Sequence, residues 1–166
     1  VRAGGEYQGY RLDDWWPPSG GGMWPDTFWN VRDGSRDRKA LFAEWEGRAG
    51  DRWMALAGIR YERVETDTGP VQAYNNAAAP ATVLVPAFNG ADRARADDNV
   101  DLTLLARHNA GPGLDVELGL ARKVRSPSLY ERYTWQSRGM EMLMVNWFGD
   151  GNGYLGNPDL EPEKAH

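Results

Sequence analysis

Residues 36–65, RDRKALFAEWEGRAGDRWMALAGIRYERVE, contain the clearest period-2 pattern in the chain and predict two β-strands joined by a tight turn. In the second half, Arg52–Glu65, one face of the expected strand carries Trp53, Ala55, Ala57, Ile59 and Tyr61. The other face carries Met54, Gly58, Arg60 and Glu62. In the first half, Arg36–Arg48, the apolar face carries Leu41, Ala43 and Trp45, and the polar face carries Glu44 and Glu46, interrupted by Phe42. The link Ala49-Gly50-Asp51 is expected to form the hairpin turn.

The length of the apolar face suits a membrane. Eight residues separate Trp53 from Tyr61, or roughly 26 Å of strand, which at a tilt of about 40° covers roughly 20 Å of depth. Trp45 and Trp53 are then expected at one level, as an aromatic girdle requires. The apolar face of one strand does not itself distinguish lipid contact from a soluble core.

The connections between strands point more firmly to a membrane protein. Further alternation marks strands near Arg2–Leu12, Asn99–His108 and Leu114–Ala121, and no amphipathic helical pattern persists. Two links are short, whereas the stretches 13–35, 66–98 and 125–166 are long. Short turns on one side and long loops on the other are typical of outer-membrane barrels. We therefore expect an all-β fold, a fragment of a large antiparallel transmembrane β-barrel with about five strands, short periplasmic turns and long extracellular loops.

Composition excludes several functions. The 166 residues carry a net charge of -5, which argues against nucleic acid as a partner. There is no cysteine and there are only two histidines, so disulfides, thiolate metal sites and histidine clusters are not expected. No apolar run is long enough for a transmembrane helix. Because five strands cannot close a barrel and the chain begins at Val1 within an apparent strand, we expect a fragment of a longer protein.

Two late motifs carry a resemblance to a known family. Leu120–Tyr133 reads LARKVRSPSLYERY, and Gly156–Glu163 reads GNPDLEPE. Both resemble the late-barrel motifs of TonB-dependent receptors, and the similarity extends over about residues 36–166. The resemblance implies that residues 1–166 are part of a 22-stranded barrel closed by an N-terminal plug, in the bacterial outer membrane. It also implies active uptake of a ferric siderophore or another metal chelate, with lipid as one partner and the TonB complex, through a plug that has no match here, as another.

Ligand contacts are expected in the long loops. The candidates are aromatic and charged residues together with one methionine: Trp15, Trp16, Met23, Trp24, Arg132, Tyr133, Trp147 and Asp150. Aromatic rings can grip a chelate, and they can equally pack the loop upon itself. For the Pro127 and Gly156–Pro158 turns we favour loop shaping over direct ligand contact. Arg60, Glu62, Glu44 and Arg107 are expected to line the polar interior.

Met140, Met142 and Met144 alternate, so in an extended strand they would share one face. Thioethers are soft ligands that suit copper(I), and Met23 lies in another loop. One hypothesis is therefore capture of copper or a copper chelate; the other is a methionine-rich strand that packs against its neighbours. No resident cofactor is expected, and a bound metal would be the transported ligand.

No catalytic grouping is present, because Ser126 and Ser128 have no nearby histidine and no nucleophile elbow occurs. We therefore do not expect an enzyme. Two alternatives to the receptor stay open from sequence: a soluble β-sandwich that binds carbohydrate through its tryptophans, and a non-energised porin.

Overall fold

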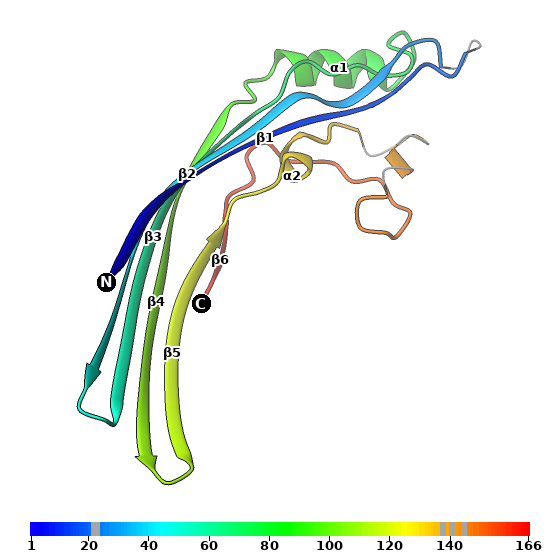
Figure 1. The fold of residues 1–166 in the computed structure, drawn as a ribbon. Coiled ribbons are helices and arrows are strands. Elements are labelled where there is room, and N and C mark those ends of the chain that lie inside the picture. The colour runs from blue at the N-terminus through cyan, green and yellow to red at the C-terminus, as the bar shows by residue number, and fades with distance from the viewer. Residues whose placement is uncertain (21–23, 137–138, 140–141, 144–145) are drawn as a thin grey trace.

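The computed structural model describes residues 1–20, 24–136, 139, 142–143 and 146–166 (Figure 1). The elements in chain order are β1 (Arg2–Trp16), β2 (Phe28–Ala49), β3 (Trp53–Asp67), α1 (Ala81–Gly90), β4 (Arg95–Gly111), β5 (Leu114–Arg125), α2 (Leu129–Tyr133) and β6 (Glu163–Ala165). The strands form one curved sheet in sequence order, and each pairs antiparallel with the next. The antiparallel barrel-type sheet expected from the sequence is thereby confirmed.

The strands are longer than the alternation alone indicated. β2 has 22 residues and β4 has 17, whereas about 9–11 residues suffice to cross an outer membrane. The sheet therefore continues past the bilayer into the regions that we expected to be loops. A sixth strand, β6, follows Pro162 and pairs with Lys123–Arg125 of β5. The sheet therefore has one strand more than the five that alternation indicated, and this strand lies within the stretch 125–166 that was expected to be a loop.

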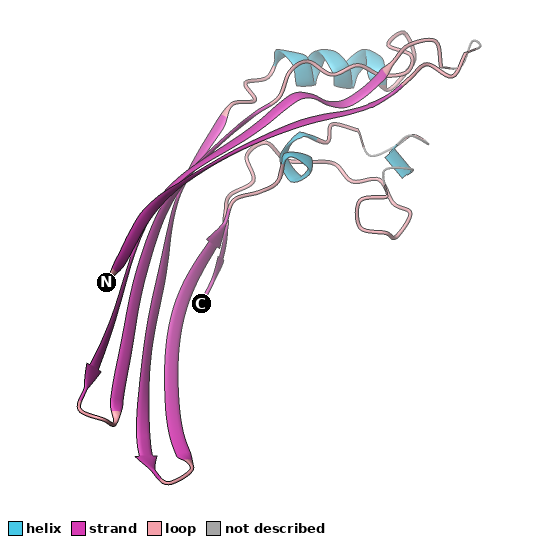
Figure 2. Cartoon of the chain, viewed as in Figure 1, coloured by secondary structure: helices cyan, strands magenta, loops and turns pink. Residues whose placement is uncertain are grey.

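Both short links are confirmed as hairpin turns, with small shifts. Ala49 pairs with Trp53, so the first turn is Gly50-Asp51-Arg52, one residue later than expected. Gly50 has a φ of +60°, a conformation that glycine adopts without steric cost. In the second hairpin Gly111 pairs with Leu114. Both turns lie at one end of the sheet and the long connections at the other (Figures 1 and 2).

The two faces of the sheet differ sharply in polarity. One face, here called the outward face, presents large apolar side chains that are about half to two-thirds exposed, among them Leu41, Ile59, Leu104, Leu118 and Leu120. The opposite face, here called the inner face, carries Arg60, Glu62, Glu44 and Arg107, as expected. Phe42 interrupts this polar face because its ring covers Gly4 on β1, where an added Cβ would lie 2.8 Å from Phe42 Cζ.

The expected alignment of Trp45 with Trp53 was wrong. Trp45 pairs with Ala57, four residues along β3 from Trp53. The two rings share the outward face but lie roughly 13 Å apart along the strand direction. Trp53 instead stacks on His108 of β4, with ring centroids 4.1 Å apart, near the hairpin end. The loop-side boundary of the apolar band is formed by Tyr7 and Tyr61.

The buried core lies among the long connections and not between two sheets. Its buried members are Phe28, Val71, Ala73, Ala81, Trp135 and Met142, and Trp16, Tyr74, Leu84, Val85 and Phe88 pack against them. The sheet itself is a single layer (Figure 2). Its outward apolar side chains are exposed. A two-layer sandwich with a dry interior is therefore excluded for the described residues.

Among the described residues, helices occur only in the long connections (Figure 2), where none was expected. α1 contains Pro86, and α2 is a single turn. Neither these nor any other helix of the described residues has the length and apolar character needed to cross a membrane.

Candidate functional site

A chain of ion pairs crosses the inner face at mid-height. Arg60 lies between two carboxylates, with its Nη2 3.0 Å from Glu6 and 3.1 Å from Glu62. Arg38 approaches the same carboxylate of Glu62 at 2.5 Å and donates to Gln8 at 2.7 Å. The Glu62 side chain is only 11% exposed, and burial of such a charge is tolerated because two guanidinium groups surround it. These contacts give the inner face a polar, charge-balanced surface.

The motif after β5 is fastened to the sheet by two buried side chains of α2. Arg132, 2% exposed, forms a hydrogen-bonded ion pair with Asp97 of β4 at 2.7 Å and donates to Thr66 at 2.9 Å. The hydroxyl of Tyr133 donates to the backbone carbonyl of Arg93 at 2.7 Å. Gly156 lies against Arg132, where a Cβ would stand 2.8 Å from the backbone carbon. Both sequence candidates, Arg132 and Tyr133, are thus buried within the chain, which favours the interpretation that this motif shapes the loop.

A capping box begins α2. The Glu131 amide donates to Ser128 Oγ at 3.2 Å, and the Ser128 amide donates to the Glu131 carboxylate at 2.6 Å. Arg125 adds a bidentate pair with this carboxylate, at 2.8 and 2.9 Å. Hydrogen bonds from Arg125, together with those from Ser128, lower the pKa of Glu131 to about 2.

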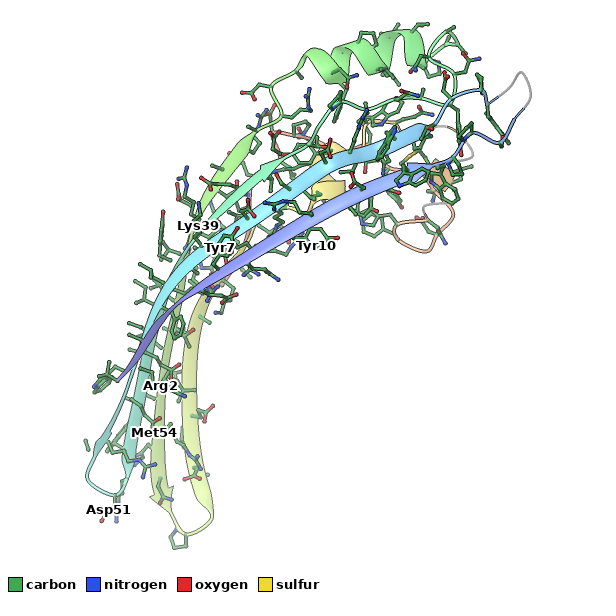
Figure 3. The ribbon with its side chains drawn as sticks, turned by 45° about the horizontal axis from the view of Figure 1, so that its top comes forward. Arg2, Tyr7, Tyr10, Lys39, Asp51 and Met54 are labelled. Atoms are coloured by element: carbon green, nitrogen blue, oxygen red, sulfur yellow. The ribbon has the colours of Figure 1, made fainter. Side chains whose placement is uncertain are left out.

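A pocket of about 350 Å³ lies between α2 and the inner face of β1 and β2. Tyr10, Leu12 and Arg36 line it from the sheet, and Leu129 and Tyr130 line it from α2. Burial raises the pKa of Tyr130 to about 12, so its hydroxyl stays a neutral hydrogen-bond donor. Figure 3 shows Tyr10 on β1. The pocket opens on the inner face beside the long connections.

Arg36 is the distinctive group of this pocket. Its guanidinium forms no hydrogen bond or ion pair with the described residues, and its Nε is buried without a partner. Burial and the neighbouring charge of Arg38 lower its pKa, yet an arginine stays cationic at any physiological pH. An unpaired cation in a partly apolar pocket is suited to receiving an anion. Sequence reasoning missed both Arg36 and Tyr10, because alternation assigns each to a strand face without showing that α2 roofs them.

The candidate tryptophans of the first long connection differ in exposure. Trp15 is half exposed and lies 5.8 Å from Trp29, centroid to centroid. Trp16 packs against the loop core, and Trp24 contacts Tyr74 at 5.8 Å. Of these candidates Trp15 offers the largest free surface. Met23 lies outside the described residues.

Trp147 and Asp150 belong to a second aromatic group. Trp147 stacks on Phe148 with centroids 4.8 Å apart and lies 5.7 Å from Tyr130 of the pocket. The exposed Asp150 carboxylate accepts hydrogen bonds from Tyr154 and Asn152. The structure thus brings Trp147 next to the α2 pocket, which sequence separation alone did not indicate, whereas Asp150 is engaged within its own loop.

The structure corrects one part of the methionine hypothesis, the expected extended conformation. Met142 lies in a helical segment with Leu143, and not in an extended strand, and it is buried in the loop core. Met140 and Met144 lie outside the described residues, so copper binding by the three methionines stays a prediction. Within the described ranges no group of three or more His, Asp or Glu side chains is placed to hold a metal ion.

The sheet and its connections define the class of protein. A single antiparallel layer with an outward apolar band, a charged inner face and ordered connections at one end is the architecture of an outer-membrane barrel wall. The family model described as "TonB dependent receptor-like, beta-barrel" matches residues 1–166, so the chain belongs to this family. No curated protein and no solved structure matches the chain.

Membership in this family places the chain in the bacterial outer membrane. The role of the family is transport that is driven through TonB. In this family the short turns face the periplasm and the long connections face the exterior. The α2 pocket therefore lies on the inner side of the barrel wall near the extracellular mouth. The family assignment also sets aside the non-energised porin.

Proposed function

We propose that this barrel wall serves the uptake of a negatively charged metal chelate, which contacts the α2 pocket on its way inward. The observation that carries the proposal is the unpaired guanidinium of Arg36. Most other arginines of the sheet face a carboxylate or a carbonyl oxygen within the chain, as Arg38, Arg60 and Arg122 do. Arg36 retains its donors for a group from outside.

The surroundings of Arg36 suit a chelate more than a free ion. Tyr10 supplies aromatic surface and a hydroxyl group from the sheet, and Tyr130 supplies aromatic surface from α2 on the facing wall of the pocket. Trp147 extends this surface, since it lies 5.7 Å from Tyr130. Aromatic surface beside a fixed cation matches a ligand that has both an organic body and a net negative charge.

The test compares Arg36→Gln with Arg48→Gln in the complete receptor, produced in cells that lack other metal receptors. Arg48→Gln is the control because it removes the same charge from β2 at a distant position, near the periplasmic turn. Cells are given radiolabelled iron either as anionic ferric citrate or as a neutral trihydroxamate chelate. Loss of one charge-assisted contact is expected to lower anionic uptake by roughly tenfold or more for Arg36→Gln only.

Equal uptake of the anionic chelate by both variants would remove Arg36 from the ligand path. Uptake of neither chelate by the unmodified receptor, when the protein is present in the outer membrane, would contradict the assignment to ferric chelates.

A further inference from the structure

The sequence contains two asparagine–glycine pairs, Asn89-Gly90 and Asn152-Gly153, and the structure places them in opposite settings. Asn89 belongs to α1 and is tied to Val71 of the loop core. Its Oδ1 accepts a hydrogen bond from the Val71 amide at 2.8 Å, and its Nδ2 donates to the Val71 carbonyl oxygen at 3.0 Å. Both polar ends of the Asn89 carboxamide are therefore engaged.

Asn152 lies in the exposed loop that follows Trp147. Figure 1 shows this loop in orange, on the α2 side of the sheet. The Asn152 amide and Nδ2 both donate to the Asp150 carboxylate, at 3.1 and 3.0 Å. Within the part of the chain that the structure describes, Asn152 Oδ1 accepts no hydrogen bond and the Gly153 amide donates none. The side-chain carbonyl and the backbone nitrogen that follows it are thus both without a partner.

An asparagine that precedes a glycine can react with its own backbone. The glycine nitrogen, after loss of its proton to water or hydroxide, attacks the side-chain carbon Cγ. A new C–N bond closes a five-membered succinimide ring, while the bond to the side-chain nitrogen breaks and ammonia leaves. Water then opens the ring at either carbonyl and gives aspartate or isoaspartate. Glycine favours the attack because it has no Cβ to obstruct the nitrogen.

The backbone around Asn152 can make the rotation that ring closure needs. Residues 146–162 belong to no strand or helix. Gly149, Gly151 and Gly153 lie within five residues, and glycine has the lowest steric barriers to such rotation. In α1, by contrast, helical hydrogen bonds and the two contacts with Val71 hold the torsions at Asn89.

We propose that Asn152 is a site of spontaneous conversion to aspartate and isoaspartate, and that the fold protects Asn89 from the same reaction. Water is the only co-reactant and ammonia the only by-product, so the reaction needs no enzyme. It also does not depend on which ligand is transported.

The product changes the loop in which it forms. A carboxylate at position 152 replaces the donor that now lies 3.0 Å from Asp150, so an attraction becomes a repulsion between like charges. Asp150 also accepts a hydrogen bond from Tyr154, whose ring lies 4.7 Å from Phe148 and 6.1 Å from Trp147. The conversion therefore adds negative charge beside the aromatic group that adjoins the α2 pocket.

The experiment incubates the complete receptor in detergent at neutral and at mildly alkaline pH. Peptide mass spectrometry with fragmentation then measures, at each asparagine, the gain of one mass unit that replacement of the amide by a carboxyl group produces. Isomerisation of an aspartate leaves the mass unchanged and is not counted. Asn152 is expected to convert at least roughly tenfold faster than Asn89, because at Asn89 two hydrogen bonds and a helical turn must break first. Alkaline pH is expected to raise the rate at Asn152.

Two glycine variants test the route of the reaction. Gly153→Ala is expected to slow conversion of Asn152 roughly tenfold or more, because a Cβ obstructs the attacking nitrogen. Gly153 is not among the glycines with a positive φ, so alanine is accommodated there. Gly90→Ala is the matched control, since the space around Gly90 is open, and it is expected to leave the rate at Asn152 unchanged.

The receptor unfolded in denaturant is the reference for the protection of Asn89. Both asparagines precede glycine, so in the unfolded chain both are expected to convert at similar rates. Equal rates at Asn89 and Asn152 in the folded receptor would overturn the proposal. So would a folded receptor in which Asn152 stays unchanged while the unfolded chain converts, or a Gly153→Ala variant that converts as fast as the unmodified protein.

Discussion

At the scale of single residues, burial decides which arginines hold the structure together. Arg132 and its partner Asp97 have side chains that are 2% and 8% exposed. Arg95 contacts Asp159 at a similar distance of 2.8 Å, but the Asp159 side chain is 80% exposed. Removing one member of a buried pair leaves an uncompensated charge, whereas water replaces a partner at the surface.

Arg132→Met is therefore expected to destabilise the receptor by about 3–5 kcal/mol, because Asp97 is left buried without its partner. Arg95→Met, the matched control, is expected to cost about 0–1 kcal/mol. Guanidinium unfolding of the complete receptor in detergent, together with protease sensitivity of the connection after β5, measures both. Similar losses for the two variants would contradict the distinction.

At the scale of elements, a helix of one turn forms because local and long-range contacts agree. α2 is too short to be stable in isolation. The Ser128–Glu131 capping box satisfies its first amides, Arg125 fixes the capping carboxylate, and Tyr133 anchors its end to the sheet. This element roofs the α2 pocket, so its stability bears directly on the site.

The stability of α2 is expected to depend on acid pH. The pKa of Glu131 is lowered to about 2 from the ordinary value of 4.5, chiefly by hydrogen bonds from Arg125. A carboxyl group whose pKa is lower in the folded state than in the unfolded state stabilises the folded state, and this stabilisation is fully present above the ordinary pKa. For Glu131 the stabilisation is lost as the pH falls from about 4.5 toward about 2. The Glu131 carboxyl shift in NMR titration should have its midpoint near the lower value.

Arg125→Gln provides the comparison for this titration. Without the guanidinium the Glu131 midpoint is expected to rise toward the ordinary range, and the α2 amides should exchange faster at mildly acid pH. A midpoint that is ordinary in the unmodified receptor would mean that the Arg125–Glu131 pair does not form in solution.

At the scale of the whole molecule, the sheet obtains its stability from two different environments. Its hairpin-side half has no covering layer, and residues such as Ile59, Leu104 and Leu118 need lipid to remove them from water. Its loop-side half is covered by the core around Phe28 and Trp135. The inner face presents charge to the barrel interior, so the two faces tolerate substitutions differently.

Ile59→Lys is expected to weaken folding into a bilayer by about 2–4 kcal/mol, because it places a charge in the middle of the lipid-facing band. Thr103→Lys is the control at almost the same height, since Thr103 pairs with Gly58 on the inner face. Reversible folding of the complete receptor into lipid vesicles measures the difference. Equal effects of the two lysines would show that the outward face does not contact lipid.

The amino-acid sequence by itself determined the strand alternation, the two hairpins, the separation of short turns from long connections and the family motifs. These features are local: side chains alternate every two residues, and Gly50 and the Pro112-Gly113 pair lie where turns require them. The α2 capping box is also a local feature of the sequence, because Ser128 is followed three residues later by Glu131.

Only the tertiary structure decided how far the strands extend, that β6 joins β5, and which side chains meet across the sheet. Arg132 reaches Asp97, 35 residues away, and Lys39 faces Arg63 only through the register of β2 and β3. Long-range packing and register are set by the summed contacts of many residues, so no short pattern encodes them. Whether Arg36 is paired or free is likewise a property of what α2 covers, and not of its neighbours in sequence.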